Sequence, residues 1–112
     1  MMMIGTLSKQ ELAEIITRVS EIYNVPPRLL LSRRRTEHIA EARQMAMVVA
    51  YQRIGNYMEV GRLFNRDHGT VVHARDKIKN RLSYDKKLSR RWMAMADLAT
   101  EPAPLDKGDY QI

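Results

Sequence analysis

Two short segments hold the side chains that are best suited to chemistry. Residues 33–35 are three consecutive arginines, and residues 66–70 run Arg-Asp-His-Gly-Thr, with His73 close behind. Guanidinium, imidazole and hydroxyl groups bind phosphate oxygens and form hydrogen bonds with base edges. These residue types favour the binding of an anion or a nucleic acid, although an ordinary solvated loop is the alternative for the arginine run.

Neither a metal site nor a catalytic site finds support in the same residues. His68 and His73 lie five positions apart, which does not fit the i, i+4 pair of a helical zinc site, and no third ligand is evident. The chain has no Cys, no phosphate-binding loop Gly-x-x-x-x-Gly-Lys-[Ser/Thr] and no Ser/His/Asp arrangement. We therefore expect no enzyme activity, no catalytic residue, no metal ion and no cofactor.

The net charge of +6 is concentrated in the middle of the chain. Residues 28–91 contain 16 Lys and Arg against 6 Asp and Glu, and the segments on either side are acidic. Such a basic region suits nucleic acid, free phosphate or an anionic membrane surface, and charge alone does not choose among them. We rank the membrane last because the charge surrounds a helix-turn-helix pattern rather than one long amphipathic face.

The composition predicts one small domain built from helices. The chain has 112 residues, of which 45% are hydrophobic and only 6% aromatic, so we expect an aliphatic, Met-rich core. The longest apolar stretch, residues 45–51, is far shorter than the roughly 20 residues that span a bilayer. The N-terminal residues lack the features of a secretory signal, so we expect a soluble cytoplasmic protein.

The first half of the chain has clear helix start and stop signals. The segment Ser8-Lys9-Gln10-Glu11 is a capping box, and apolar residues at helical spacing follow it, which predicts a helix over about 8–24. Pro26 ends this helix, and residues 27–32 form a short turn that adds leucines to the core. A further helix is expected from about 38–40 to 53.

Residues 57–82 have the spacing of a helix-turn-helix. Asn56 is an N-cap candidate for a short helix through Phe64, and Asp67 is one for a longer helix through Leu82. A short helix, a tight turn and a longer helix form the DNA-binding motif whose second helix enters the major groove N-terminus first.

The whole chain is expected to be all-α. We predict a last helix over roughly 85–99 and find neither a strand pattern nor an internal repeat. The expected organisation is an N-terminal extension (1–7), a single helical DNA-binding domain (8–99) and an acidic flexible tail (100–112).

Two motifs carry a resemblance to a known family. LSRRR…ARQMAM (residues 31–35 and 42–47) and RDHGTVVHA (residues 66–74) resemble the C-terminal DNA-binding domain, domain IV, of the bacterial replication initiator DnaA. The similarity runs from about residue 12 to 95. It implies a helical bundle containing a helix-turn-helix, Trp-repressor-like in fold, that binds an A·T-rich box close to TTATCCACA. The family places its recognition helix in the major groove and a basic loop in the minor groove.

The resemblance also implies roles for individual residues. Arg35 matches the family's minor-groove arginine, which suits the negative potential of a narrow A·T-rich minor groove. Asp67, His68 and Thr70 match residues that contact base edges or adjacent phosphates, and His73 matches a further polar contact. The complete DNA-binding set that we expect is Arg33, Arg34, Arg35, Arg43, Gln44, Arg66, Asp67, His68, Gly69, Thr70, His73, Arg75 and Lys77.

Four positions depart from the family pattern, one of them the loop around Gly55, which is one residue shorter. The single Asn65 stands where Gly-Gly usually precedes Arg-Asp-His, so the turn is one residue shorter. Gly69 occupies a position that usually holds a base-contacting Ser or Thr, and Tyr51 stands where a Lys is common. We expect the fold to tolerate these changes and the preferred DNA sequence to differ.

The leading hypothesis is therefore sequence-specific binding of double-stranded DNA at a DnaA-box-like site, in a replication or transcription regulator without ATPase activity. The alternative is a bacterial or phage protein-interaction module that uses the same fold without specific DNA recognition. A replication or transcription protein is a candidate partner for the acidic tail. Monomer and homodimer both stay open, with the helix after Leu82 as the candidate dimer contact. The expected setting is the bacterial nucleoid or a phage-infected cell.

Overall fold

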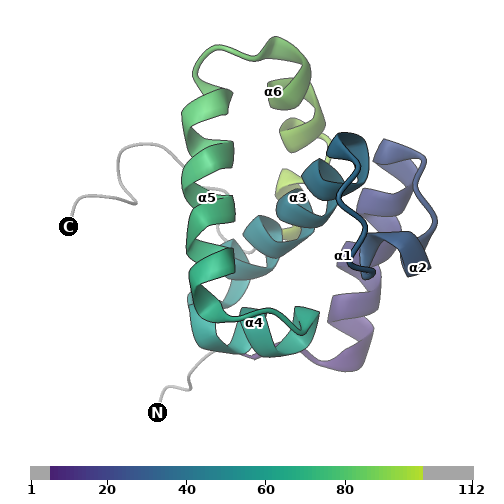
Figure 1. Ribbon diagram of the computed structural model, residues 1–112, viewed down its shortest axis with the longest axis vertical. Coiled ribbons are helices and arrows are strands. Elements are labelled where there is room, and N and C mark those ends of the chain that lie inside the picture. Colours follow the sequence, from purple (N-terminus) through teal and green to yellow (C-terminus); the bar gives the residue numbers. More distant parts are fainter. Residues whose placement is uncertain (1–5, 100–112) are drawn as a thin grey trace.

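The computed structural model describes residues 6–99, and every regular element in that range is a helix. Figure 1 shows α5 along one side, with α4 across its N-terminal end and α6 beyond its C-terminal end. This confirms the predicted all-α fold. The elements are α1 (Lys9–Tyr23), α2 (Pro27–Leu30), α3 (Glu37–Ile54), α4 (Tyr57–Phe64), α5 (His68–Leu82), α6 (Lys86–Met93) and the 3-10 turn η1 (Ala96–Leu98).

The core forms around α3, which passes diagonally through the middle of the molecule (Figure 1). Residues 45–50 of this helix are all buried, because α1, α2, α4, α5 and η1 surround it. A helical segment that is apolar all round, as residues 45–50 are, is typical of such a central position. The described core is aliphatic and rich in Met, as the composition predicts.

Local capping explains where the predicted helices begin. The Ser8 Oγ accepts from the Glu11 N–H at 3.0 Å, and the Ser8 N–H donates to the Glu11 carboxylate at 2.9 Å, so the capping box is complete. Asn56 and Asp67 cap α4 and α5 in the same way, each through its side-chain oxygen. All three predicted helix starts are confirmed.

The predicted last helix over 85–99 is too long. Helix α6 ends at Met93, and η1 follows after a turn. The turn allows contacts that a straight helix would miss: Arg18 donates to the Ala94 carbonyl at 3.0 Å and pairs with Asp97 at 2.8 Å. Arg53 donates to the Leu98 carbonyl at 2.8 Å.

A cluster of charged and polar side chains around Glu41 connects α6 to the other helices. The Glu41 side chain, 12% exposed, accepts from Arg81 at 2.9 Å and from Arg91 at 3.0 Å. The Tyr23 hydroxyl donates to the same carboxylate at 2.6 Å, and the Arg91 guanidinium lies over the Tyr23 ring. Burial alone would raise the pKa of Glu41, but these hydrogen bonds and positive charges lower it on balance. One carboxylate thus joins α1, α3, α5 and α6.

The last two residues of the expected N-terminal extension (1–7) pack against the fold. Leu7 is buried in the core, and the Thr6 hydroxyl donates to Glu59 at 2.7 Å. The remainder of the expected extension, residues 1–5, and the expected acidic tail, residues 100–112, lie outside the described residues. Among residues 6–99, no helix has both the length and the apolar character needed to cross a membrane.

Candidate nucleic-acid interface

The turn between α4 and α5 is tight because of one residue in an unusual conformation. Asn65 has φ 57° and ψ 47°, the left-handed region that glycine and asparagine tolerate best. The chain reversal is closed by a hydrogen bond of 2.8 Å from the Arg66 N–H to the Gly61 carbonyl. Asn65 therefore adopts a conformation for which glycine is the usual choice, and the single residue is enough to close the turn.

Gly61 lets α4 approach this turn closely. A Cβ built on Gly61 would lie 2.5 Å from the Arg66 carbonyl oxygen and 3.3 Å from the backbone of Asp67 and His68. No side chain fits in that space. The two helices of the motif are therefore joined by direct backbone contact.

The first turn of α5 carries most of the candidate base-contacting groups. The Asp67 Oδ1 accepts from the Thr70 N–H at 3.0 Å and lies 3.2 Å from the Thr70 hydroxyl. These hydrogen bonds lower the pKa of Asp67 and keep it ionised. Further along the exposed side of the helix follow His73 and Lys77.

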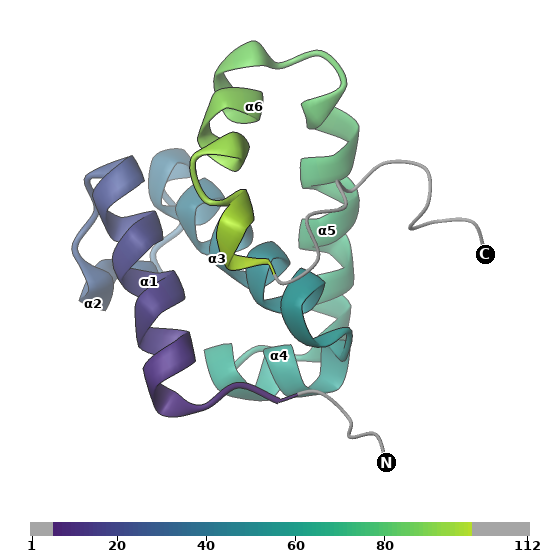
Figure 2. The same ribbon diagram turned by 180° about the vertical axis from the view of Figure 1, so that it is seen from behind.

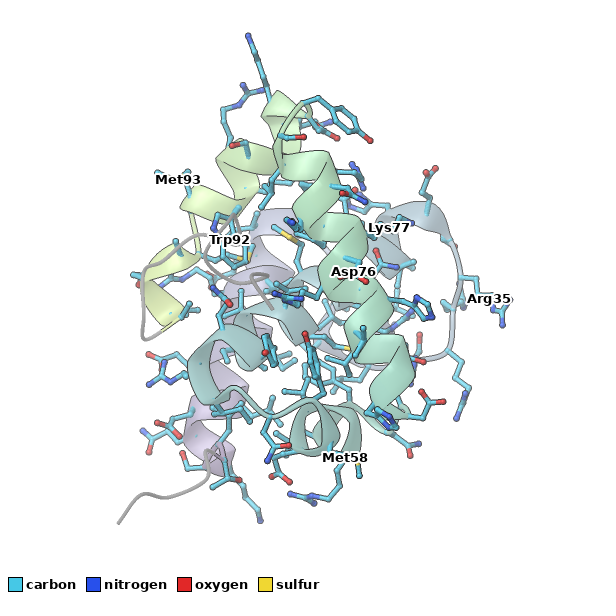
Figure 3. The ribbon with its side chains drawn as sticks, turned by 90° about the vertical axis from the view of Figure 1, so that its left-hand side faces the viewer. Arg35, Met58, Asp76, Lys77, Trp92 and Met93 are labelled. Atoms are coloured by element: carbon cyan, nitrogen blue, oxygen red, sulfur yellow. The ribbon has the colours of Figure 1, made fainter. Side chains whose placement is uncertain are left out.

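The arginine run lies on the α2–α3 connection, beside α5. Ser32 organises its start, since its hydroxyl donates to the Leu29 carbonyl at 2.6 Å and accepts from the Arg34 N–H at 3.1 Å. Figure 3 shows Arg35 extending from the body of the molecule on the side of Lys77, opposite Trp92 and Met93.

Arg66 connects the arginine run to the helix-turn-helix. One nitrogen of its guanidinium donates to the Ser32 carbonyl at 2.7 Å, and another donates to the Phe64 carbonyl at 3.1 Å. Burial lowers the pKa of Arg66, and the nearby charge of Arg33 lowers it further. A shallow hollow of about 400 Å³ lies where the two segments meet. It is lined by Arg33, Gly61, Arg62, Asn65, Arg66, Asp67 and Thr70.

A second hollow, of about 230 Å³, lies between α3 and α5. Its polar lining is Arg43, Gln44, Arg66, Thr70, His73 and Lys77. Arg66 and Thr70 line both hollows, so the structure brings part of the expected set from both motifs together. The expected residues that line neither hollow are Arg34, Arg35, His68, Gly69 and Arg75.

Exposure divides the expected DNA-binding set into three groups. The exposed members are Arg33, Arg34, Arg35, Asp67, His68, Thr70, His73 and Lys77. The half-buried members are Gln44, Arg66 and Gly69. The buried members are Arg43 and Arg75.

The two buried arginines make contacts inside the protein. Arg43, 7% exposed, donates to the Leu30 carbonyl at 2.9 Å and the Leu29 carbonyl at 3.3 Å, and burial lowers its pKa. Arg75, 8% exposed, lies over the Tyr51 ring at 5.7 Å from its centroid. Tyr51 stacks in turn on Tyr57, with ring centroids 4.1 Å apart. The Arg43 contacts attach α2, which precedes the arginine run, to α3. The Arg75–Tyr51–Tyr57 contacts attach the helix-turn-helix, α4 and α5, to α3.

Gly69 has no comparable structural reason to be glycine. It lies inside α5, and a Cβ built on it would meet only the Asp67 Oδ1 at 3.4 Å, an ordinary contact. A Cβ is therefore tolerated at this position in the folded chain.

Sequence reasoning missed several residues that shape this region. Ser32 follows three leucines, and a Ser at the end of a short helix is a recognisable turn signal. Asp76 is exposed on α5 and adds a negative charge to the helix (Figure 3). No group of three or more His, Asp or Glu residues in the described range has an arrangement that would hold a metal ion.

Comparison with known proteins gives consistent results. The sequence pattern of a family described as bacterial dnaA protein helix-turn-helix matches residues 12–78, which extend from α1 into α5. The chain is 42% identical over 77 residues to the chromosomal replication initiator protein DnaA of Streptococcus pyogenes serotype M4 (strain MGAS10750). The DnaA protein of serotype M5 (strain Manfredo) is 40% identical over 77 residues. Each alignment covers 67% of this chain and 17% of the relative.

Proposed function

Because the chain belongs to the family of the bacterial DnaA helix-turn-helix, whose fold implies binding of double-stranded DNA, we propose that it binds DNA in a sequence-specific manner. The proposed site is an A·T-rich box similar to TTATCCACA. The observation that carries the proposal is the Arg66–Ser32 hydrogen bond of 2.7 Å, which holds the arginine loop at a set position beside the recognition helix. A protein that contacts two adjacent grooves needs two elements at a set spacing.

The first turn of α5 is the part proposed to enter the major groove. The major groove of B-DNA, about 12 Å wide, accepts an α-helix. His68 and Thr70 are exposed at the N-terminal end, where base edges would lie, and His73 is exposed one turn further on. The Thr70 hydroxyl can form a hydrogen bond with a base, and its methyl group can pack on thymine.

Arg35 is the residue proposed to enter the minor groove. It is exposed and stands on the same side of the molecule as Lys77 (Figure 3). An arginine inserted into a narrow A·T-rich minor groove gains from the concentrated negative potential there. Arg33 and Arg34, also exposed, are assigned to phosphates, which position the protein without specifying sequence.

The less exposed members of the set receive different roles. Gln44 and Lys77 line the hollow between α3 and α5 and are assigned to a phosphate. Arg43 and Arg75 are assigned to positioning, because the carbonyls of α2 and the Tyr51 ring already engage them. Arg66 combines both roles, since it lines both hollows.

At the level of the cell, the proposed role is regulation of replication or transcription. A protein that binds initiator boxes with residues 8–99 as one unit can compete for them without hydrolysing ATP. A bacterial nucleoid and a phage-infected cell both provide such sites. We propose the acidic tail, residues 100–112, as the contact for a replication or transcription protein.

The test is a titration followed by fluorescence anisotropy. The protein is added to a labelled duplex carrying TTATCCACA and to a scrambled duplex, each at two salt concentrations. Specific binding at physiological salt is expected to exceed non-specific binding by about 10³-fold, or by less for a single small module. Arg35→Ala and Thr70→Ala should lose the preference, whereas Arg90→Ala, which removes an exposed arginine on α6, should keep it.

Other outcomes have clear meanings. Equal and steeply salt-dependent binding to both duplexes would mean that the target sequence differs, and a random-sequence selection would identify it. Binding to neither duplex would contradict the proposal and favour a protein-interaction module.

A further inference from the structure

Helix α6 presents a cationic outer face that the proposed DNA interface does not use. Leu88 and Trp92 are buried, so the opposite side of this short helix points outward. A hollow of about 250 Å³ on that side is lined by Lys86, Ser89, Arg90 and Met93. Met93 is 71% exposed, a high value for a large apolar side chain. Methionine adapts its shape to a partner and is frequent at protein-binding surfaces, so Met93 gives this cationic face an apolar contact point.

Helix α1 presents the complementary charge. Glu14 and Glu21 are exposed one above the other, two turns apart, with Thr17 between them. A shallow groove of about 730 Å³ runs along this face. Among the described residues that line it, the cation is Arg18, which pairs with Asp97 at 2.8 Å, so this described lining has a net negative charge.

A symmetric contact between two α6 helices is disfavoured. In a two-fold symmetric dimer the same patch meets itself, so Lys86 and Arg90 of one copy would face the same cations of the other. Juxtaposed like charges oppose association. The complementary surface on the described part of the chain is the α1 groove.

We propose that the α6 face of one copy docks on the α1 groove of a second copy, so that molecules associate head to tail. The role of this contact in DNA binding rests on the proposed function. Both faces are available to a DNA-bound protein, because α1 and α6 come toward the viewer in Figure 2, the side opposite to that of Figure 1, and Met93 lies opposite Arg35 in Figure 3. A head-to-tail contact repeats with the same orientation at each step.

The size of the contact determines where it operates. An eight-residue helix is about 12 Å long, and its face buries much less than the roughly 1,000 Å² of a stable interface. The contact is therefore weak between free molecules. When two copies bind neighbouring sites on one duplex, their high local concentration lets even a weak contact increase the affinity of the second copy. We therefore expect cooperative binding to directly repeated boxes, which place both copies in the same orientation. We expect no cooperativity on inverted boxes.

The first experiment compares duplexes carrying one box, two directly repeated boxes or two inverted boxes, over spacings that cover one helical turn. The expected result is about tenfold tighter binding of the second copy at the best direct spacing. Lys86→Glu with Arg90→Glu should abolish this gain and leave single-box affinity unchanged. Glu14→Lys with Glu21→Lys should do the same. The protein with all four substitutions keeps the original net charge of +6 and should recover the gain.

A second experiment works without DNA. The two charge-reversed proteins are mixed at low salt and at high protein concentration, where a weak contact still forms, and are followed by sedimentation velocity, since each supplies the face that the other needs. Association of the mixture but of neither variant alone supports the contact, and no association of the mixture contradicts it even if DNA binding itself fails. Single-box binding without a gain on any direct repeat, or a gain that survives both charge reversals, would contradict the contact while leaving the proposed function intact.

Discussion

The Arg66 guanidinium donates a hydrogen bond of 2.7 Å to the Ser32 carbonyl oxygen, which joins two segments that lie 34 residues apart in the sequence. Ser32 precedes the arginine run, and Arg66 precedes the recognition helix. The bond therefore sets the distance between the two groups of candidate DNA contacts. The same guanidinium donates to the Phe64 carbonyl at the end of α4, so the Arg66 side chain connects both α4 and the start of the arginine run to the turn.

Arg66→Lys should weaken specific DNA binding by about tenfold, nearly as much as Arg66→Ala. A lysine keeps the charge but lacks the planar fork that donates to several carbonyls at once. Anisotropy titrations of both variants against box and scrambled duplexes test this. A lysine variant that binds like the original protein would mean that Arg66 acts through its charge on phosphates, and circular dichroism checks that both variants are folded.

Two glycines should respond to the same substitution with opposite signs. Gly61→Ala should reduce the free energy of unfolding by about 1–3 kcal/mol, because its Cβ would meet the Arg66 carbonyl oxygen at 2.5 Å. Gly69→Ala should increase it by about 0.5 kcal/mol, because α5 accepts the methyl group and loses a flexible residue. Urea unfolding of the two variants measures both changes. Equal effects would contradict the close approach described at Gly61.

Gly69→Thr should change which DNA sequence is preferred without loss of stability. The position is half-buried at the tip of the recognition helix, and an added hydroxyl and methyl group can contact a base there. Selection from a random duplex library, carried out on both proteins, should give recovered sequences that differ at one or two adjacent positions. Identical selected sequences would show that residue 69 faces away from the bases.

Asp67 should act mainly as a helix cap. Its carboxylate already accepts from the Thr70 N–H, so Asp67→Ala should cost about 1 kcal/mol of stability. Asp67→Asn, which retains a capping oxygen, should be almost as stable as the original. It should also bind DNA at least as tightly, because a negative charge near phosphates is removed. Weaker specific binding by the Asn variant would instead assign the carboxylate to a base.

The Glu41 cluster should give stability a specific pH dependence. The pKa of Glu41 is lower in the folded protein than its ordinary value of 4.5, so the stability that it contributes is complete above pH 4.5 and is lost as the pH falls through the lower folded pKa. Glu41→Gln should reduce the free energy of unfolding by about 2–3 kcal/mol at pH 7. Urea unfolding between pH 7 and pH 3 should show this difference narrowing in acid. A constant difference would mean that the carboxylate does not titrate with folding.

Local interactions explain what the sequence predicted well. Ser8, Asn56 and Asp67 cap helices through atoms three residues away, and such contacts can be anticipated from adjacent residue types. The helix-turn-helix follows from the last two of these caps. The end of α6 could not be anticipated, because Arg18 and Arg53 from other helices bind the carbonyls of Ala94 and Leu98.

Tertiary position explains what the sequence left open at the site. The sequence offers Arg35 and Arg43 alike as members of the DNA-binding set, yet Arg35 is exposed and Arg43 is buried, where it donates to the carbonyls of α2. Glu41 gave no signal, since its partners Arg81 and Arg91 lie 40 and 50 residues away. Residue type indicated a basic DNA-binding protein, and only the packing of α3 decided which arginines reach the surface.

The backbone contact at Gly61 determines whether the protein or the DNA duplex changes conformation when they bind. Because no side chain separates α4 from the turn, α4 and α5 cannot easily slide or rotate relative to each other. A mismatch in shape is then absorbed by the duplex, which bends and twists more readily at pyrimidine–purine steps than elsewhere. Base pairs that the protein does not contact would therefore influence which DNA site it prefers, because some sequences deform more easily than others.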